Sequence, residues 1–182
     1  MPVPVDHDVL SSKQACAELV YKLARGLDRC DDALLRSVFH DDATDDHGGF
    51  KGSASDFVGW ALGLLAKMER TQHLIGNILV EVEGDRAVGE AYFVANHDML
   101  GADGRAVRMI AAGRYLDRFE RRDGVWKIAH RHAVYDWNAN HERTDTWDRS
   151  ADSPRRFGER GAADAVYAHL ASLHNDRMRV EA

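Results

Sequence analysis

The chain has 182 residues, of which 45% are hydrophobic and 30% are charged, and its formal net charge is −6 at pH 7. A chain of this length and composition can bury one apolar core, which excludes a fibrous or largely disordered protein. The acidic balance gives no basic surface for nucleic acid, and no apolar run is long enough for a membrane span, so neither partner is expected. Because the N-terminal segment lacks the basic start and apolar stretch of a secretory signal, we expect a cytoplasmic protein.

Helices are predicted in the first part of the chain. Apolar side chains recur at three- and four-residue spacing over residues 11–28, which predicts an amphipathic helix with one buried face. A second, short helix is predicted over residues 34–39, and the Asp-rich stretch 41–49 that follows is interpreted as a loop. Residues 53–68 begin with a Ser/Asp cap pattern and continue with apolar residues at helical spacing, which predicts a third helix.

Long strands are predicted after the helices. Four β-rich runs follow one another, over residues 73–82, 86–97, 107–119 and 125–137. The segments between them, at residues 83–85, 102–104 and 122–124, each contain the Gly and Asp that tight hairpin loops need. Four strands joined by hairpins form an antiparallel meander. The predicted fold class is therefore α+β, with the N-terminal helices packed on a curved antiparallel sheet that encloses a cavity.

The strand faces and the C-terminal region indicate contacts beyond the core. The second predicted strand carries apolar or uncharged residues on both faces, for example Phe93 on one and Tyr92 on the other. A sheet with one face in water would alternate more clearly, so we expect the convex face to pack on another subunit in a dimer or trimer. Residues 1–140 are assigned to the domain and residues 141–182 to an extension. Residues 162–173 regain a helical pattern and should pack on the domain or on a neighbouring subunit.

Asp28 and His73 are the first candidates for chemistry. Asp28 lies at the C-terminal end of the first predicted helix, where the helix dipole disfavours a carboxylate, and it continues the apolar stripe in line with Tyr21. Its charge should be resisted there, which would make it a better proton acceptor, although the pattern also fits a surface Asp at a helix end. His73 opens the first long strand and either shuttles a proton near pH 7 or is structural.

Further candidates lie on later strands. His97 shares a strand face with small residues such as Ala91, which leave room for a ligand. In the last predicted strand, His130 and His132 occupy one face and Arg131 the other. Only one of these faces can line the cavity, and the sequence leaves open which one.

Patterns for metal, cofactor and nucleophilic sites are weak or absent. The spacing of His130 and His132 would allow two metal ligands on a strand, but no His-Glu-x-x-His pattern or Cys/His cluster accompanies it. Cys16 and Cys30, the two cysteines, fit neither a disulfide framework nor a metal site and are interpreted as packing residues. No dinucleotide, P-loop or nucleophile-elbow pattern occurs, so we expect acid–base chemistry in an apolar pocket with neither cofactor nor metal.

Four segments resemble a known family: DDHGGFKG at residues 45–52, TQHLIGN at 71–77, GRYLDRFE at 113–120 and DGVWKIAHR at 123–131. Over about residues 8–140 the chain resembles the SnoaL-like branch of the nuclear transport factor 2-like superfamily. Members similar to it include scytalone dehydratase, hexachlorocyclohexane dehydrochlorinase and bile acid 7α-dehydratase, which are cofactor-free lyases and commonly trimers. The resemblance specifies the fold and branch rather than the substrate.

The resemblance implies roles for particular residues. Lyases of this type use an aspartate of the first helix and a histidine of the first long strand as a dyad, which implies Asp28 and His73 here. The aspartate would orient and charge the imidazole, and the imidazole would remove or deliver the proton. A second histidine of the dehydratase pattern falls on His97, and a basic residue that handles the leaving group in some members falls on Arg131.

The phenol of the dehydratase pattern has no direct match in this chain. Scytalone dehydratase has a tyrosine immediately before its first-helix aspartate, whereas this chain has Leu27, so Tyr21 is the candidate two helical turns before Asp28. Polar and aromatic side chains are expected to contact the substrate, namely Asp45, Phe50, Trp60, Tyr92 and Tyr115.

The sequence thus predicts a cofactor-independent lyase that removes water from a bulky hydrophobic, aromatic or polycyclic alcohol. A formaldehyde-releasing retro-aldol lyase acting on lignin-derived diarylpropanes is the alternative enzyme. A non-catalytic small-molecule-binding module is the alternative class, because this fold hosts many carriers. A hydrogen bond between Asp28 and His73 inside a closed apolar cavity would favour the enzyme, and an Asp28 in open solvent would favour the module.

Overall fold

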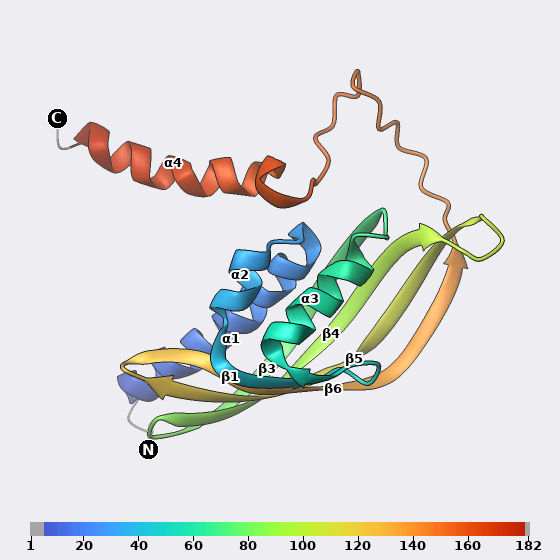
Figure 1. Cartoon of the computed structure of the whole chain (residues 1–182). Helices are drawn as coiled ribbons and strands as arrows, with labels where there is room; N and C mark the ends of the chain where they lie inside the picture. Colours follow the sequence, from blue (N-terminus) through green and yellow to red (C-terminus); the bar gives the residue numbers. More distant parts are fainter. Residues whose placement is uncertain (1–5, 181–182) are drawn as a thin grey trace, which may run out of the picture.

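The computed structural model describes the backbone of residues 6–180 and the side-chain environments of residues 6–173 (Figure 1). Helices come first in the chain and long strands follow, as predicted. The elements are α1 (His7–Arg29), α2 (Asp32–Ser37), β1 (Phe39–Asp46), β2 (Lys51–Ser53), α3 (Ala54–Leu65), β3 (Arg70–Glu83), β4 (Arg86–Leu100), β5 (Ala106–Arg122), β6 (Val125–Glu142), the 3₁₀ helix η1 (Gly161–Ala163) and α4 (Ala165–Val180).

The strands of the described chain form one curved sheet in the order β2-β1-β6-β5-β4-β3. Strands β3 to β6 pair antiparallel as the predicted meander, and Figure 1 shows α1, α2 and α3 on the concave side of this sheet. Strand β1 joins the sheet parallel to β6, and β2 pairs antiparallel with β1. The α+β class and the helix-covered, curved sheet are confirmed, and one parallel strand pair is added to the predicted antiparallel arrangement.

Helix α1 begins earlier than predicted because Asp6 caps it, accepting hydrogen bonds from two backbone N–H groups of the first turn. It ends at Cys30, which adopts a left-handed conformation with a φ of 50°. Gly26 lies where α2 approaches, and a Cβ there would be 2.7 Å from the Leu35 side chain. This glycine therefore allows the two helices to pack closely and fixes the end of α1, which carries Asp28.

The Asp-rich stretch predicted as a loop over residues 41–49 is wrong for its first part, which forms strand β1. Two of its acidic residues are paired with cations from outside the stretch. Asp42 accepts a hydrogen bond from Arg122, and the Asp46 carboxylate lies 3.0 Å from the Lys51 ammonium. Tertiary pairing therefore overrides a composition that is typical of a solvent-exposed loop.

Strand β6 settles which of its faces points inward. Arg131 and Ala133 are buried on the inner face, whereas His132 is exposed on the outer face. A register shift against β5 places Ile128 on the inner side as well, contrary to simple alternation. Strand β6 also continues to Glu142, so the domain boundary predicted at residue 140 falls inside a strand.

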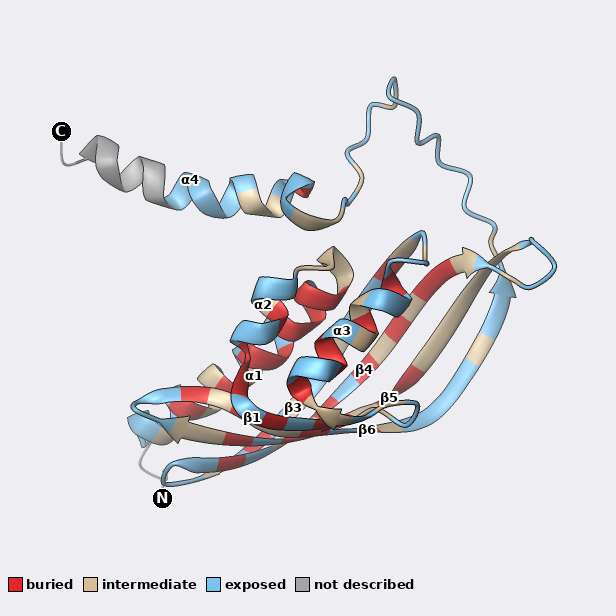
Figure 2. Cartoon of the chain, in the orientation of Figure 1, coloured by how far each residue is buried: buried red, intermediate tan, exposed pale blue. Residues whose placement is uncertain are grey.

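Burial follows the two sides of the sheet. Figure 2 shows buried residues concentrated where the helices meet the concave side. Leu79, Val88 and Leu116 line a shallow apolar depression on the convex side and are 39–64% exposed. The coverage of this face by another subunit stays a prediction. None of the described helices combines the length and apolarity that a membrane crossing requires.

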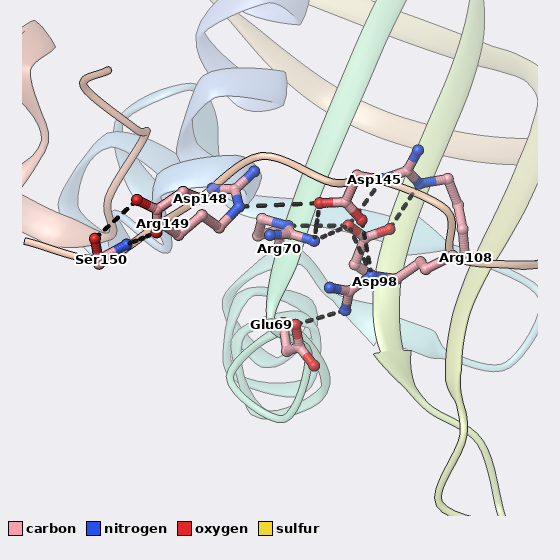
Figure 3. A network of polar contacts seen from close by, with 9 residues as sticks. Glu69, Arg70, Asp98, Arg108, Asp145, Asp148, Arg149 and Ser150 are labelled. Carbon is pink, nitrogen blue, oxygen red and sulfur yellow. Dashed lines mark hydrogen bonds and ion pairs between the residues drawn. The ribbon is translucent and has the colours of Figure 1, made fainter. Parts of the chain in front are cut away.

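An ion-pair network holds the start of the extension against the sheet (Figure 3). Asp98 of β4 accepts hydrogen bonds from Arg70 of β3 and Arg108 of β5, and Arg70 also reaches Asp145 of the extension at 3.3 Å. Burial opposes the charge on Asp98, but the hydrogen bonds from Arg108 and Arg70 outweigh it and lower the pKa of Asp98 to about 2. The network therefore stays ionised at neutral pH.

The extension returns to the C-terminal end of α1. Asp164 accepts a hydrogen bond from Arg29 at 2.8 Å, and the Tyr167 hydroxyl donates one to Asp31 at 2.6 Å. The first turn of α4 thus packs on its own domain, which is one of the two predicted arrangements. These contacts involve residues one and three positions after Asp28 and hold the end of α1 in place.

Candidate active site

An apolar cavity of about 200 Å³ lies between the helices and the inner face of the sheet. Residues of α3, the turn after β1, and strands β3 to β6 surround it. Its lining consists of Leu27, His47, Phe57, Trp60, Ala61, Leu64, Leu65, Met68, His73, Phe93, Ala95, His97, Met109, Ala111, Tyr115 and Tyr135. Three histidines are therefore the titratable imidazoles of a cavity that is otherwise aromatic and aliphatic.

The structure brings Asp28 and His73 together at one wall of this cavity. Helix α1 ends beside the first residues of β3, so the Asp28 carboxylate reaches His73 Nδ1 at 2.8 Å. The same carboxylate accepts the backbone N–H of His73 at 2.9 and 3.1 Å, which fixes its orientation. The side chains are 13% and 7% exposed, so Asp28 is not in open solvent.

The charge of the pair differs from the sequence-based expectation for Asp28. Burial does resist its ionisation, but the hydrogen bonds and charge of His73 outweigh burial and hold the pKa of Asp28 below its usual range. The expectation that Asp28 is itself the better proton acceptor is therefore wrong. As a carboxylate it has no proton to give, so His73 Nδ1 carries the hydrogen of their bond, and in the neutral form of the ring the lone pair is on Nε2.

His97 stands next to His73 in the cavity wall. The two ring centroids are 5.5 Å apart and the rings are nearly perpendicular. Burial, reinforced by the charge of His73, lowers the pKa of His97 to about 4. His97 is therefore neutral at pH 7. Its buried Nδ1 has no hydrogen-bond partner among the described residues, which leaves a polar atom for a ligand to satisfy.

Arg131 does not reach the cavity, contrary to the prediction that it handles a leaving group. Its guanidinium is fully buried and makes two hydrogen bonds of 2.7 Å to Asp117. It lies 4.0 Å from the centre of the Tyr115 ring, which separates it from the cavity. Burial raises the pKa of Tyr115, so its phenol is neutral. The alternation of inward and outward residues along the strand could not show that an aromatic ring would cover the arginine.

Two predicted tyrosines also lie outside the cavity. Tyr21 is 48% exposed, because the buried face of α1 is formed by residues such as Leu23 and Leu27 and Tyr21 points away from it. Tyr92 is 42% exposed on the convex face, since its neighbour Phe93 is the one that turns inward. The substrate contact predicted for Tyr92 does not fit this position. Tyr21 lines a separate, open depression together with Asp28 and His73, so its role as phenol donor stays a prediction.

The remaining predicted contacts lie at or behind the cavity wall. Trp60 and Tyr115 line the cavity. The Phe50 ring packs behind them, with its centroid 5.5 Å from that of Trp60. Asp45 is fully buried and contacts the cavity indirectly, through His47 at 3.0 Å. Sequence reasoning missed His47 because it did not predict strand β1, which positions the turn that carries this residue.

Metal ligands do not gather at this site. Across the described part of the chain, no three His, Cys, Asp or Glu side chains form a group that could hold a metal ion. The site is instead built from histidine–carboxylate pairs that face an apolar cavity. Such pairs orient an imidazole and transfer protons.

Comparisons with known proteins agree with this architecture. No curated protein matches the sequence. Among solved structures, hexachlorocyclohexane dehydrochlorinase LinA-type3 from Novosphingobium barchaimii is 25% identical, with a TM-score of 0.63 over 72% of this chain and 91% of that one. A candidate scytalone dehydratase from Novosphingobium aromaticivorans is 21% identical, with a TM-score of 0.63 over 81% and 96%.

A third similar structure also covers the extension. A protein of unknown function from Mycobacterium tuberculosis is 24% identical, with a TM-score of 0.60 over 97% of this chain and 94% of that one. The SnoaL-like domain family matches residues 8–132, which contain helices α1 to α3, strands β1 to β5 and the first half of β6. The chain belongs to the SnoaL-like family.

Proposed function

We propose that the chain is a cofactor-independent lyase in which His73, held by Asp28, takes a proton from a hydrophobic substrate. One observation carries the proposal: a buried carboxylate holds His73 Nδ1 at 2.8 Å, and the same side chain lines an apolar cavity. A carrier needs a pocket but no oriented proton acceptor. The similarity to a dehydrochlorinase and to a candidate scytalone dehydratase supports the same reaction class.

The leading reaction is an elimination that uses proton transfers alone. His73 Nε2 takes a proton from a substrate carbon, and the electron pair of the broken C–H bond forms a C=C bond. The leaving group departs with the electrons of its own bond to carbon. Because Asp28 is ionised, it stabilises the imidazolium that forms on His73, while the neutral His97 offers a hydrogen bond to a polar group of the substrate.

The cavity favours a small substrate with an aromatic ring. Its 200 Å³ exceeds the cavity of about 150 Å³ that accepts benzene, but lies below the roughly 300 Å³ at which drug-sized ligands begin. Phe57, Trp60 and Tyr115 offer ring faces and edges on its walls. We therefore propose one- or two-ring substrates in place of the bulky polycyclic alcohols predicted from the sequence.

A substrate screen tests this proposal. Dialysed protein without added cofactor is incubated with one- and two-ring alcohols, the corresponding chlorides and a diarylpropane diol, and products are identified by mass spectrometry with aldehyde trapping. We expect loss of water or hydrogen chloride by the wild type and a rate reduced by about 10² to 10⁴-fold in His73→Gln.

The other outcomes separate the alternatives. Trapped formaldehyde from the diol would replace elimination by the retro-aldol reaction, in which His73 deprotonates a hydroxyl. Binding without turnover, seen as quenching of Trp60 fluorescence, would identify a carrier. Turnover that is equal in wild type and His73→Gln would contradict the assigned base.

A further inference from the structure

A second histidine–carboxylate pair faces the same cavity from another wall. His47 Nδ1 lies 3.0 Å from Asp45 Oδ1, and the side chains are 12% and 0% exposed. Strand β1 supplies Asp45, and the turn that follows supplies His47. The arrangement repeats that of Asp28 and His73, in which Nδ1 also contacts a buried carboxylate.

The chain holds the His47 ring firmly in this position. Its backbone N–H donates to the Phe50 carbonyl at 2.7 Å, and its own carbonyl accepts the Gly49 N–H at 2.8 Å, which closes a tight turn. The imidazole stacks on Phe57, with ring centroids 4.7 Å apart and an interplanar angle of 27°. Backbone, carboxylate and stacking together fix the ring before a substrate arrives.

One edge of this ring is left for chemistry. With Nδ1 committed to Asp45, Nε2 has no hydrogen-bond partner among the described residues, and the side chain lines the cavity. The rings that approach it, Tyr115 at 5.9 Å and Tyr135 at 6.2 Å, are neutral phenols that do not compete for its proton. A doubly protonated imidazole in this position carries a hydrogen on Nε2, which it can give to a group in the cavity.

We propose that His47 is a second acid–base residue, which protonates the leaving oxygen while His73 removes the proton from carbon. This inference rests on the proposed lyase function. The C–H proton goes to His73 Nε2, and the C–H electron pair becomes the C=C bond. The C–O electron pair stays on oxygen, which takes the Nε2 proton of His47 and leaves as water. Solvent then takes the extra proton from His73 and returns one to His47.

Leaving-group dependence tests this role. A chloride leaves without a proton, whereas a hydroxyl needs one, so His47→Gln should slow the alcohol by about 10²-fold or more and the matched chloride by less than about 3-fold. His40→Gln is the matched control, because His40 lies on β1, the strand that precedes His47, but its Nε2 bonds the Glu120 carbonyl away from the cavity. That variant should eliminate both substrates at the wild-type rate.

A second measurement uses the wild type alone and does not depend on the folding of a variant. Because only the alcohol needs an acid for its leaving group, kcat/KM for the alcohol should fall at high pH, and for the chloride this alkaline fall should be absent. Equal loss on both substrates in His47→Gln, no loss on either, or the same alkaline fall for both leaving groups overturns the role of His47 while the lyase stands. A wild type that eliminates neither overturns the proposed function and this inference with it.

Discussion

Two buried charged pairs on the concave side of the sheet differ in whether they line the cavity. Arg131 and Asp117 are 0% and 1% exposed, meet in two hydrogen bonds of 2.7 Å, and lie behind the Tyr115 ring. Asp28 and His73 are nearly as buried, but one nitrogen of the imidazole is left at the cavity. Burial therefore does not distinguish a structural pair from a reactive one. The atom left open toward a cavity does.

The largest expected effect comes from Asp28→Asn. The amide oxygen can still accept the His73 N–H groups, but the charge that stabilises the imidazolium is lost, so we expect kcat to fall by about 10² to 10⁴-fold. Steady-state kinetics measure this fall, and the thermal unfolding midpoint of the same variant shows whether it is still folded. A variant with normal kcat would show that the pair is as structural as that of Arg131.

Substitution of the Arg131–Asp117 pair should change the stability of the protein rather than its reaction rate. Arg131→Met leaves Asp117 as a buried, unpaired charge, which should lower the free energy of unfolding by about 3–5 kcal/mol. The double variant Arg131→Met/Asp117→Leu should recover most of this loss, because no charge remains buried. Urea denaturation measures both. If the double variant is stable but loses at least about 10²-fold in kcat, the pair belongs to the chemistry after all.

A smaller effect concerns acid stability and His97. Because its pKa is about 4 in the folded state and near 6.5 when exposed, the unfolded chain binds a proton between these values that the folded chain does not. Stability from this residue is thus complete above pH 6.5 and falls as the pH drops toward 4, by on the order of 3 kcal/mol in all.

Denaturation of His97→Gln at neutral pH and near pH 5 isolates this contribution. Asp28 does not affect this comparison. Because its pKa is lowered in the folded state, its contribution to stability is lost only below the ordinary value of 3.8. His130, whose pKa is also lowered by burial, remains in both proteins and cancels. Identical pH dependence in variant and wild type would mean that His97 is not held neutral.

The smallest effect is expected for Tyr21→Phe. Tyr21 is half-exposed outside the cavity, so removal of its hydroxyl should change kcat by less than about 2-fold and the stability by less than about 0.5 kcal/mol. A loss of about 10²-fold would establish Tyr21 as the phenol of the site, acting from the depression that it lines with Asp28 and His73.

Much of the fold was predictable because its patterns are local. Hairpin glycines such as Gly84, with a φ of 59°, and the Ser53 cap of α3 act within a few residues, and the structure confirms both elements. Strand β1 was not predictable, because what neutralises its acidic residues is distant in sequence, as with Arg122 and Asp42. Local pattern cannot reveal such a pair.

The candidate site was predictable in part for the same reason. The predicted end of the first helix and the predicted start of the first long strand pointed to Asp28 and His73. The family resemblance then implied that these two residues act as a pair. The position of Arg131 behind Tyr115 depends on how rings pack across two strands, which alternation does not encode. His47 depends on a turn after a strand that itself was not predicted.

The rate of His73→Gln in a single turnover tests the central claim most directly. Enzyme in excess is mixed with the best substrate of the screen, product is followed by rapid quench, and the unfolding midpoint is recorded for the same samples. The account predicts a rate constant at least about 10²-fold below wild type with an unchanged midpoint. A rate constant within about 3-fold of wild type would contradict it, because the open nitrogen of His73 would then have no part in the reaction.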